Sequence, residues 1–226
     1  MDALFHQPLF YIYFIYGVSF LTMSYVIFQG VGKATSMVLV ATFQTLAIFG
    51  LTHGIRELLD WVSFIVENNG RPEVAWLHGL SDVFLIISFV VLLQFAVNLL
   101  SYRSERKTTY QLIPALLVAL GIVVVVVTGT YESSQVALCV RRSFGFAGAI
   151  LSGVAFCKLA FAMRAIGNAR VEWGLILGAL AFFAYSVFGG LIVTTVGGHP
   201  VQIFRALCAF SIAVASTLIL GIFRQA

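Results

Sequence analysis

Residues 74–100 read VAWLHGLSDVFLIISFVVLLQFAVNLL, and no charged side chain follows Asp82 in this stretch. A helix of about 20 apolar residues crosses the roughly 30 Å hydrocarbon core of a bilayer, so the stretch is long enough to span a membrane. Lipid offers no hydrogen-bond partner to the backbone, and a helix pairs its backbone groups within itself. The stretch is therefore predicted to be a transmembrane helix.

The composition of the whole chain agrees with this prediction. Hydrophobic residues make up 61% of the 226 residues and charged residues 10%, whereas soluble proteins are about half apolar and one quarter charged. The mean hydropathy is +1.02. No polar stretch is long enough to form a second domain, so residues 1–226 are predicted to form a single membrane domain.

Seven apolar runs have the length that a crossing requires. The chain is thus predicted to be an all-α membrane protein, a bundle of seven transmembrane helices. The predicted spans are residues 9–29, 37–60, 74–100, 112–130, 143–163, 172–196 and 201–223. Glycine-containing turns separate several of the runs, and Pro72 and Pro200 stand where a following helix can begin.

The basic residues predict the orientation of the bundle. Alternate connections carry Lys33, the group Arg103, Arg106 and Lys107, the pair Arg164 and Arg170, and finally Arg224. Under the positive-inside rule these connections are cytoplasmic. The amino terminus is therefore predicted outside the cytoplasm and the carboxyl terminus inside. The amino terminus has no basic leader region, so the first helix is expected to be retained.

The second predicted span carries four ionisable residues on one face. His53, Arg56, Glu57 and Asp60 follow the spacing i, i+3, i+4 and i+7, which places them on one side of a helix with 3.6 residues per turn. Ionisable groups at membrane depth usually face the interior of a bundle or a wet cavity. This face is therefore expected to point inward.

The third predicted span offers His78 and Asp82 at i and i+4 near the same end of the bundle. Counting about 1.5 Å of rise per residue places Glu57 and His78 within one helical turn of each other in depth. The two side chains are therefore expected to share a binding partner.

Arginines near the outer ends of later spans extend the candidate site. Arg141, Arg142 and Arg205 lie on the side where the topological bias does not call for basic residues. Carboxylates or a bound anion would give them a local role. The candidate ligand-binding residues are Arg56, Asp60, Arg141, Arg142 and Arg205.

Three interpretations of this cluster remain open. In the first, the charged groups only pair with one another, Arg56 with Asp60 and His53 with Glu57. In the second, two nitrogens and two oxygens bind a transition metal, zinc or non-haem iron. The metal ligands would be His53, Glu57, His78 and Asp82. In the third, His53 and His78 hold a b-type haem, with arginines on its propionates.

Three segments resemble a family of bacterial membrane sensors. They are YGVSF at 16–20, LTHGIRELLD at 51–60 and RSFGFAGA at 142–149. The chain resembles the amino-terminal seven-helix region of sensor histidine kinases and diguanylate cyclases. This resemblance implies a sensory input module in the cytoplasmic membrane of a bacterium. The chain carries no kinase or cyclase domain, so it is expected to be a truncated or free-standing relative and not itself an enzyme.

The predicted function is accordingly that of a membrane sensor module. A ligand, metal or haem would bind in the outer half of the bilayer and signal to a cytoplasmic output. The expected partners are the lipid bilayer and a cytoplasmic signalling domain or protein, with a homodimer as an option and no nucleic acid. Two rivals are a metal-dependent membrane hydrolase and a proton-coupled transporter that uses Asp82 and His53 as a relay.

Overall fold

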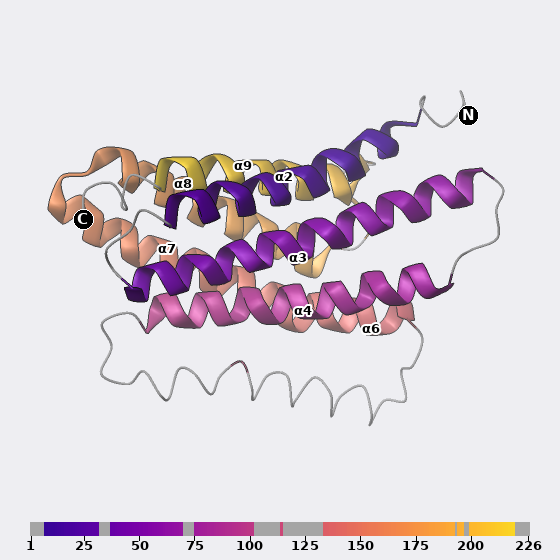
Figure 1. Cartoon of the computed structure of the whole chain (residues 1–226), viewed down its shortest axis with the longest axis horizontal. Helices are drawn as coiled ribbons and strands as arrows, with labels where there is room; N and C mark the ends of the chain where they lie inside the picture. Colours follow the sequence, from indigo (N-terminus) through magenta and orange to yellow (C-terminus); the bar gives the residue numbers. More distant parts are fainter. Residues whose placement is uncertain are drawn as a thin grey trace.

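The computed structural model describes residues 7–31, 37–69, 75–101, 114, 133–192, 194–196 and 199–219. Nearly all of these residues are helical (Figure 1). The α-helices are α2 (Pro8–Val31), α3 (Met37–Asn68), α4 (Ala75–Leu100), α6 (Ser133–Val140), α7 (Phe146–Ile166), α8 (Ala169–Tyr185) and α9 (Val201–Ile219). Two π-helical segments, η1 (Arg141–Gly145) and η2 (Ser186–Leu191), and a short hairpin of β1 (Thr195–Val196) and β2 (His199–Pro200) complete the described elements.

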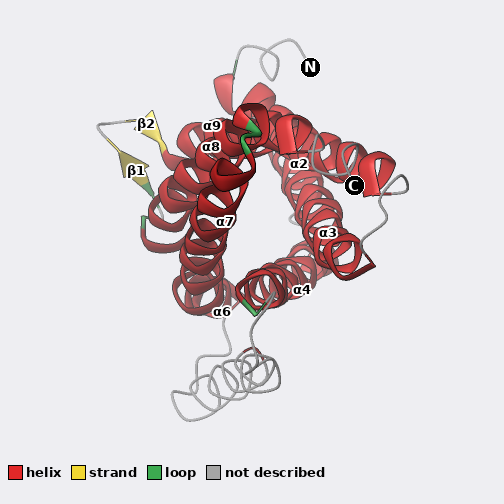
Figure 2. Cartoon of the chain, turned by 90° about the vertical axis from the view of Figure 1, so that its left-hand side faces the viewer, coloured by secondary structure: helices red, strands yellow, loops and turns green. Residues whose placement is uncertain are grey.

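The helices form a closed ring. In the order α2, α3, α4, α7, α8 and α9, each helix packs against the next, and α9 packs against α2 (Figure 2). Most neighbours are antiparallel, but α4 and α7 run in parallel, since Gly145 lies against Phe89 and Gly148 against Leu92. Helices α2 and α9 are also parallel. The described chain therefore begins and ends at opposite ends of the bundle (Figure 1).

Large aromatic side chains fill the centre of the ring. Several of them have no accessible surface, so each contributes dispersion contacts on all sides. The fully buried aromatic residues are Phe20, Phe49, Phe89, Phe95, Phe156 and Phe182 together with Tyr16. Phe156 on α7 contacts Phe95 on α4 edge to face and meets Phe182 on α8 in the same way. Aromatic packing thus joins α4, α7 and α8, three consecutive helices of the ring.

Small residues allow neighbouring helices to approach closely. Gly174 and Gly178 on α8 are four residues apart, and the sequence identifies them as a helix-packing motif. A Cβ atom at Gly174 would lie 2.7 Å from the Cβ of Leu218 on α9. A Cβ atom at Gly178 would lie 2.7 Å from the ring of Phe156 on α7. Glycine at both positions is therefore required by the packing of α8 against its two neighbours.

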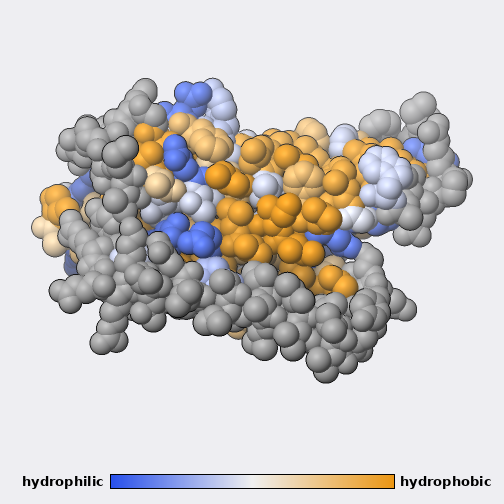
Figure 3. All heavy atoms as spheres, turned by 60° about the horizontal axis from the view of Figure 1, so that its bottom comes forward, coloured by the Kyte–Doolittle hydropathy of each residue, from blue (hydrophilic) through white to orange (hydrophobic). Residues whose placement is uncertain are grey.

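The outside of the ring is apolar, as expected for a protein in lipid. Aromatic and aliphatic side chains with more than half of their surface exposed include Tyr25, Phe161, Leu180, Leu207 and Phe210. Figure 3 shows hydrophobic residues across the middle of the face in view. So large an apolar surface would make a soluble monomer aggregate. The chain is a helical multi-pass membrane protein.

Among the described residues, five helical segments are long and apolar enough to cross a membrane. They are Pro8–Val31, Trp76–Leu100, Gln135–Ile166, Ala169–Leu191 and Val201–Ile219. Helix α3 has 32 residues and so also has sufficient length, but it carries the charged face that the sequence predicts. Apart from residue 114, the predicted span at 112–130 lies outside the described residues.

Three predicted boundaries differ from the structure by five residues or more. Helix α3 continues two turns past residue 60 to Asn68, because residues 61–66 (WVSFIV) are mostly apolar and continue the helix beyond Asp60. The helix predicted to begin at residue 143 is already helical from Ser133, so Arg141 and Arg142 lie inside it and not before it. The span predicted to end at residue 196 ends at Leu191, and the hairpin follows.

Candidate functional site

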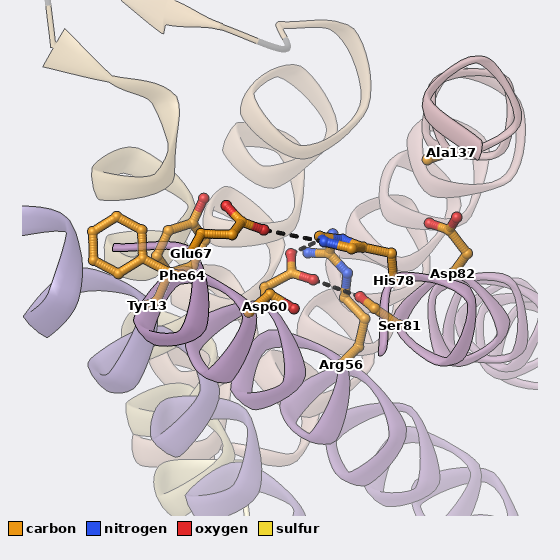
Figure 4. A pocket seen from close by; sticks show the side chains of 10 residues that line it. Tyr13, Arg56, Asp60, Phe64, Glu67, His78, Ser81, Asp82 and Ala137 are labelled. Atoms are coloured by element: carbon orange, nitrogen blue, oxygen red, sulfur yellow. Dashed lines mark hydrogen bonds and ion pairs between the residues drawn. The ribbon is translucent and has the colours of Figure 1, made fainter. Parts of the chain in front are cut away.

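A polar cavity opens at the end of the bundle where α2 begins, α3 ends and α4 begins. Its volume is about 400 Å³, within the range of small-molecule binding sites. Its walls come from α2, α3, α4 and α6 (Figure 4). The lining residues are Tyr13, Arg56, Asp60, Ser63, Phe64, Glu67, His78, Ser81, Asp82 and Ala137. We call this cavity the pocket, and its end of the bundle the pocket end.

Arg56 forms the charged floor of the pocket. One of its terminal nitrogens bonds the carboxylate of Glu57, and Nη2 lies 2.6 Å from Oδ2 of Asp60 one turn further along α3. The hydroxyl of Ser81 on α4 donates to Oδ1 of the same aspartate at 2.5 Å. The predicted pairing of Arg56 with Asp60 is therefore present. Ser81 extends this pairing from α3 to α4.

The mouth of the pocket holds a second ion pair. Nε2 of His78 on α4 lies 3.1 Å from Oε1 of Glu67 on α3. Glu67 is exposed and His78 is half-buried, so this pair faces solvent at the end of the two helices. Asp82 lines the pocket one turn below His78. With Asp60, the pocket walls thus carry three carboxylates.

His53 lies at the centre of the ring and has no accessible surface. Its ring is surrounded by the rings of Phe20, Phe49 and Phe89 at centroid distances of 4.8 to 5.3 Å. Its Nδ1 is 2.8 Å from the hydroxyl of Ser88 on α4. Its Nε2 is 2.8 Å from the hydroxyl of Tyr185 on α8.

The hydrogen bonds around His53 run in one direction when the imidazole is neutral. The hydroxyl of Ser88 donates to the carbonyl oxygen of Leu85 at 2.8 Å, so it can only accept from Nδ1 of His53. Nε2 then carries a lone pair and accepts from the hydroxyl of Tyr185. That hydroxyl in turn accepts from Tyr16 on α2 at 2.9 Å. A single chain of hydrogen bonds therefore joins α2, α8, α3 and α4.

Glu57 connects this chain to the floor of the pocket. Its Oε1 is 3.5 Å from Nε2 of His53 and also bonds Arg56. Its other oxygen, Oε2, is buried and has no hydrogen-bond partner among the described residues. The sequence predicts a pairing of His53 with Glu57, and the structure places the two side chains 3.5 Å apart. The shorter contact of Glu57 is with Arg56.

The three outer arginines have different environments. Arg141 in η1 is buried, with 5% of its surface exposed, and no residue in the described part of the chain forms a hydrogen bond with its Nη1. Arg205 on α9 is also buried, but it donates to the carbonyl oxygens of Phe188 and Ile192 at the end of η2. Arg142 is exposed. The prediction that Arg142 faces the buried acids is wrong, because the helix already includes residue 141 and turns that side chain inward instead.

The predicted four-ligand metal centre is not assembled. No group of three or more His, Cys, Asp or Glu side chains among the described residues is placed to hold a metal ion. His53 bonds Ser88 and Tyr185, while His78 bonds Glu67 more than two turns further toward the pocket end. Each ring nitrogen of His53 already has a hydrogen-bond partner. An iron bound by both histidines would therefore require His53 to give up at least one of these hydrogen bonds.

Three members of the hydrogen-bonded chain, Tyr16, Ser88 and Tyr185, were not predicted as site residues. Tyr16 is assigned by its sequence position to an interfacial belt, yet it is fully buried and bonds Tyr185. Ser88 is one of many serine and threonine residues in the membrane helices. Its role as a partner of His53 becomes visible only when the two helices are packed together. The signal available in the sequence is that Tyr16 and Phe20 share a helical face at i and i+4.

The fold and the site together define a multi-pass helical membrane protein with a polar pocket above a buried charged network. No known protein family matches the chain, and no curated protein or solved structure is significantly similar to it. The arguments for function therefore come from the residues of this chain.

Proposed function

We propose that the chain is a membrane-embedded sensory input module that binds a small ligand in the pocket and signals to its opposite end. One observation carries the proposal. The pocket is partly open, and its floor residue Arg56 belongs to a buried network that reaches four helices. A site that only stabilised the bundle would not need a cavity of about 400 Å³ above that network.

The proposal includes seven spans with the pocket end outside the cytoplasm, in the inner membrane of a bacterium. The parallel direction of α4 and α7 supports the proposal of seven spans. Successive crossings of a membrane alternate in direction, so two parallel helices require an odd number of crossings between them. The basic residues Lys158, Arg164 and Arg170 lie at the end of the bundle opposite the pocket. Their position agrees with a cytoplasmic location for that end.

Signalling would run through the hydrogen-bonded chain. A ligand that contacts Arg56 or Asp60 changes the partners of Glu57, and Glu57 approaches the same ring nitrogen of His53 that Tyr185 bonds. Tyr185 holds α8 against Tyr16 on α2. The ligand would bind two packings of these helices unequally, which is the thermodynamic requirement for any such response.

The experiment measures whether a change in the pocket moves the opposite end of the bundle. Spin labels are attached to cysteines at exposed Phe28 on α2 and Trp173 on α8, after the three native cysteines are replaced by serine. The substitution Ala137→Trp fills the pocket. We expect this substitution to shift the distance distribution between the two labels in lipid nanodiscs.

The matched control is Val154→Trp, which places the same side chain on the exposed, lipid-facing side of α7. This variant should leave the distance distribution as it is in the parent protein. If filling the pocket changes the distances no more than the control does, the pocket does not communicate with the opposite end, and the chain is not a sensor of this kind.

A further inference from the structure

The described residues that line the pocket carry more negative than positive charge. Three carboxylates, one arginine and one histidine line it, namely Asp60, Glu67, Asp82, Arg56 and His78. Carboxylates outnumber cations in this set even when the histidine is protonated. The single charge of Arg56 is also shared with Glu57, a buried carboxylate that is not among the lining residues. The lining therefore favours a cationic ligand and disfavours an anion.

Two of these carboxylates are accessible from the pocket (Figure 4). The side chain of Asp60 is 20% exposed and that of Glu67 is 47% exposed. Asp60 uses one oxygen for Arg56 and the other for Ser81. A carboxylate has about four acceptor positions, so each oxygen of Asp60 can accept a further hydrogen bond. A ligand in the pocket thus meets acceptors that it reaches without entering the buried network.

Aromatic rings line the pocket beside these acids. Tyr13 on α2 and Phe64 on α3 both line it, with ring centroids 5.9 Å apart. Phe64 follows Asp60 by four residues, so its ring lies one turn along the same face of α3. The side-chain amide of Gln202 donates to the hydroxyl of Tyr13 at 3.2 Å and holds that ring in place. Faces of aromatic rings attract cations, and methylated ammonium groups most characteristically.

The wall also includes a polar side chain that the protein leaves unused. Ser63 lines the pocket and is 5% exposed, and its hydroxyl has no hydrogen-bond partner in the described part of the chain. Other hydroxyls in these helices donate to a carbonyl oxygen one turn earlier, as in Ser19, Thr45 and Ser152. An unsatisfied buried hydroxyl is typical of a site that a ligand or ordered water completes. Because its oxygen is enclosed, the direct contacts of a ligand are the accessible carboxylates and rings.

We infer that the pocket binds a small organic ammonium ion. Its charged nitrogen donates to Asp60, its carbon atoms pack against Tyr13 and Phe64, and Glu67 at the mouth attracts it. A bare metal ion fits less well, because no three His, Cys, Asp or Glu side chains among the described residues are placed to hold one.

The inference rests on the proposed function, since it names the ligand class of the same pocket, but the two can fail separately. If an ammonium ion binds and the spin-label distances do not respond to filling of the pocket, the sensor is refuted and the ligand class stands. If the distances respond and no ammonium ion binds, the ligand class is refuted and the sensor stands.

The test compares three probes of similar size and different charge, namely isobutylamine, 2-methylpropan-1-ol and isobutyrate. Binding to the full-length chain is measured at pH 7 by calorimetry in nanodiscs of uncharged phosphatidylcholine, so that the lipid itself does not attract the amine. We expect isobutylamine to bind with a dissociation constant of about 10 mM or less, within the range of very small ligands. It should bind at least about tenfold more tightly than the alcohol, because its hydrogen bond to Asp60 is charge-assisted. Isobutyrate should not bind.

Two variants of the lining carboxylates locate the bound amine. Asp60→Asn should weaken binding of isobutylamine by at least about tenfold. Glu67→Gln should weaken it by about threefold, because a half-exposed carboxylate contributes less. The matched control is Glu172→Gln, which changes a carboxylate paired with Arg164 at the opposite end of the bundle and should leave binding unaltered.

If Asp60→Asn fails to fold, Ala137→Trp takes its place, and this variant should abolish binding by filling the pocket. Two results would overturn the inference. The first is that the alcohol or isobutyrate binds as tightly as isobutylamine, or that the amine shows no saturable binding. Ordered water would then be the occupant of the pocket. The second is equal binding of the amine in the parent, Glu67→Gln and Ala137→Trp proteins, which would place it elsewhere.

Discussion

Tyr185 on α8 donates a hydrogen bond of 2.8 Å to Nε2 of His53 on α3, and both side chains are buried at the centre of the ring. Tyr185 also accepts a hydrogen bond of 2.9 Å from Tyr16 on α2. The direction of the first bond follows from Ser88, because its only proton goes to the carbonyl oxygen of Leu85. The arrangement therefore assigns unequal roles to the two tyrosines.

The first prediction compares Tyr185→Phe with Tyr16→Phe. Tyr185→Phe leaves both Nε2 of His53 and the hydroxyl of Tyr16 without a partner, whereas Tyr16→Phe leaves only a lone pair on Tyr185. Each buried unsatisfied group costs about 1–3 kcal/mol. Thermal unfolding in detergent should show the larger loss of stability for Tyr185→Phe. Equal losses in the two variants would contradict the assigned direction of the hydrogen bonds.

The second prediction concerns the tautomer of His53. Nitrogen-15 chemical shifts should show the proton on Nδ1, because Ser88 offers only an acceptor there. In Ser88→Ala this acceptor is gone, so the proton should move to Nε2, where Glu57 lies at 3.5 Å. The matched control is Ser81→Ala, which removes a hydroxyl bonded to Asp60 and not to the histidine. A proton on Nε2 in the parent protein would contradict the assigned direction of the hydrogen bonds around His53.

The third prediction uses double-mutant cycles on ionisable residues of α3 and α4. The sequence predicts that Glu57 and His78 share a partner, but the structure gives them different ones, Arg56 and Glu67. The losses in stability from Glu57→Gln and His78→Ala should therefore add within about 0.5 kcal/mol. Arg56→Gln and Glu57→Gln touch one ion pair and should couple by about 0.5–3 kcal/mol. Strong coupling between Glu57 and His78 would restore the shared site.

Hydropathy and helical periodicity predict much of the fold because lipid imposes simple requirements on a chain. Apolar runs of sufficient length lie where α2, α4, α8 and α9 are found, and glycines four residues apart identify a packing face of α8. The start of the fifth predicted helix was misplaced, since Arg141 and Arg142 resemble a loop in an apolar sequence. Burial of Arg141 inside a π-helical segment has no simple periodic signature.

The candidate site was predictable only in part. Spacing along one helix identifies the face of His53, Arg56, Glu57 and Asp60, and the Arg56 to Asp60 pair follows from i, i+4 geometry. Contacts between helices depend on the rotation and offset of each helix, which the sequence pattern leaves undetermined. For this reason Tyr185 and Ser88 emerge as partners of His53 only in the folded bundle, and His78 proves to pair with Glu67.

The last prediction concerns the contact between η2 and the start of α7, which positions Tyr185 immediately before η2. A Cβ atom at Gly190 would lie 2.8 Å from Cβ and 2.9 Å from Cα of Phe146, so Gly190→Ala must push η2 away from α7. The expected loss is about 1–3 kcal/mol, as for other overpacked sites. Gly79→Ala on α4 is the control, since a Cβ atom there meets nothing within 4 Å. Alanine at this helical position should be neutral or stabilising by up to about 1 kcal/mol. Unfolding temperatures that fall for Gly190→Ala and stay level or rise for Gly79→Ala would support the close contact, and a tolerated Gly190→Ala would contradict it.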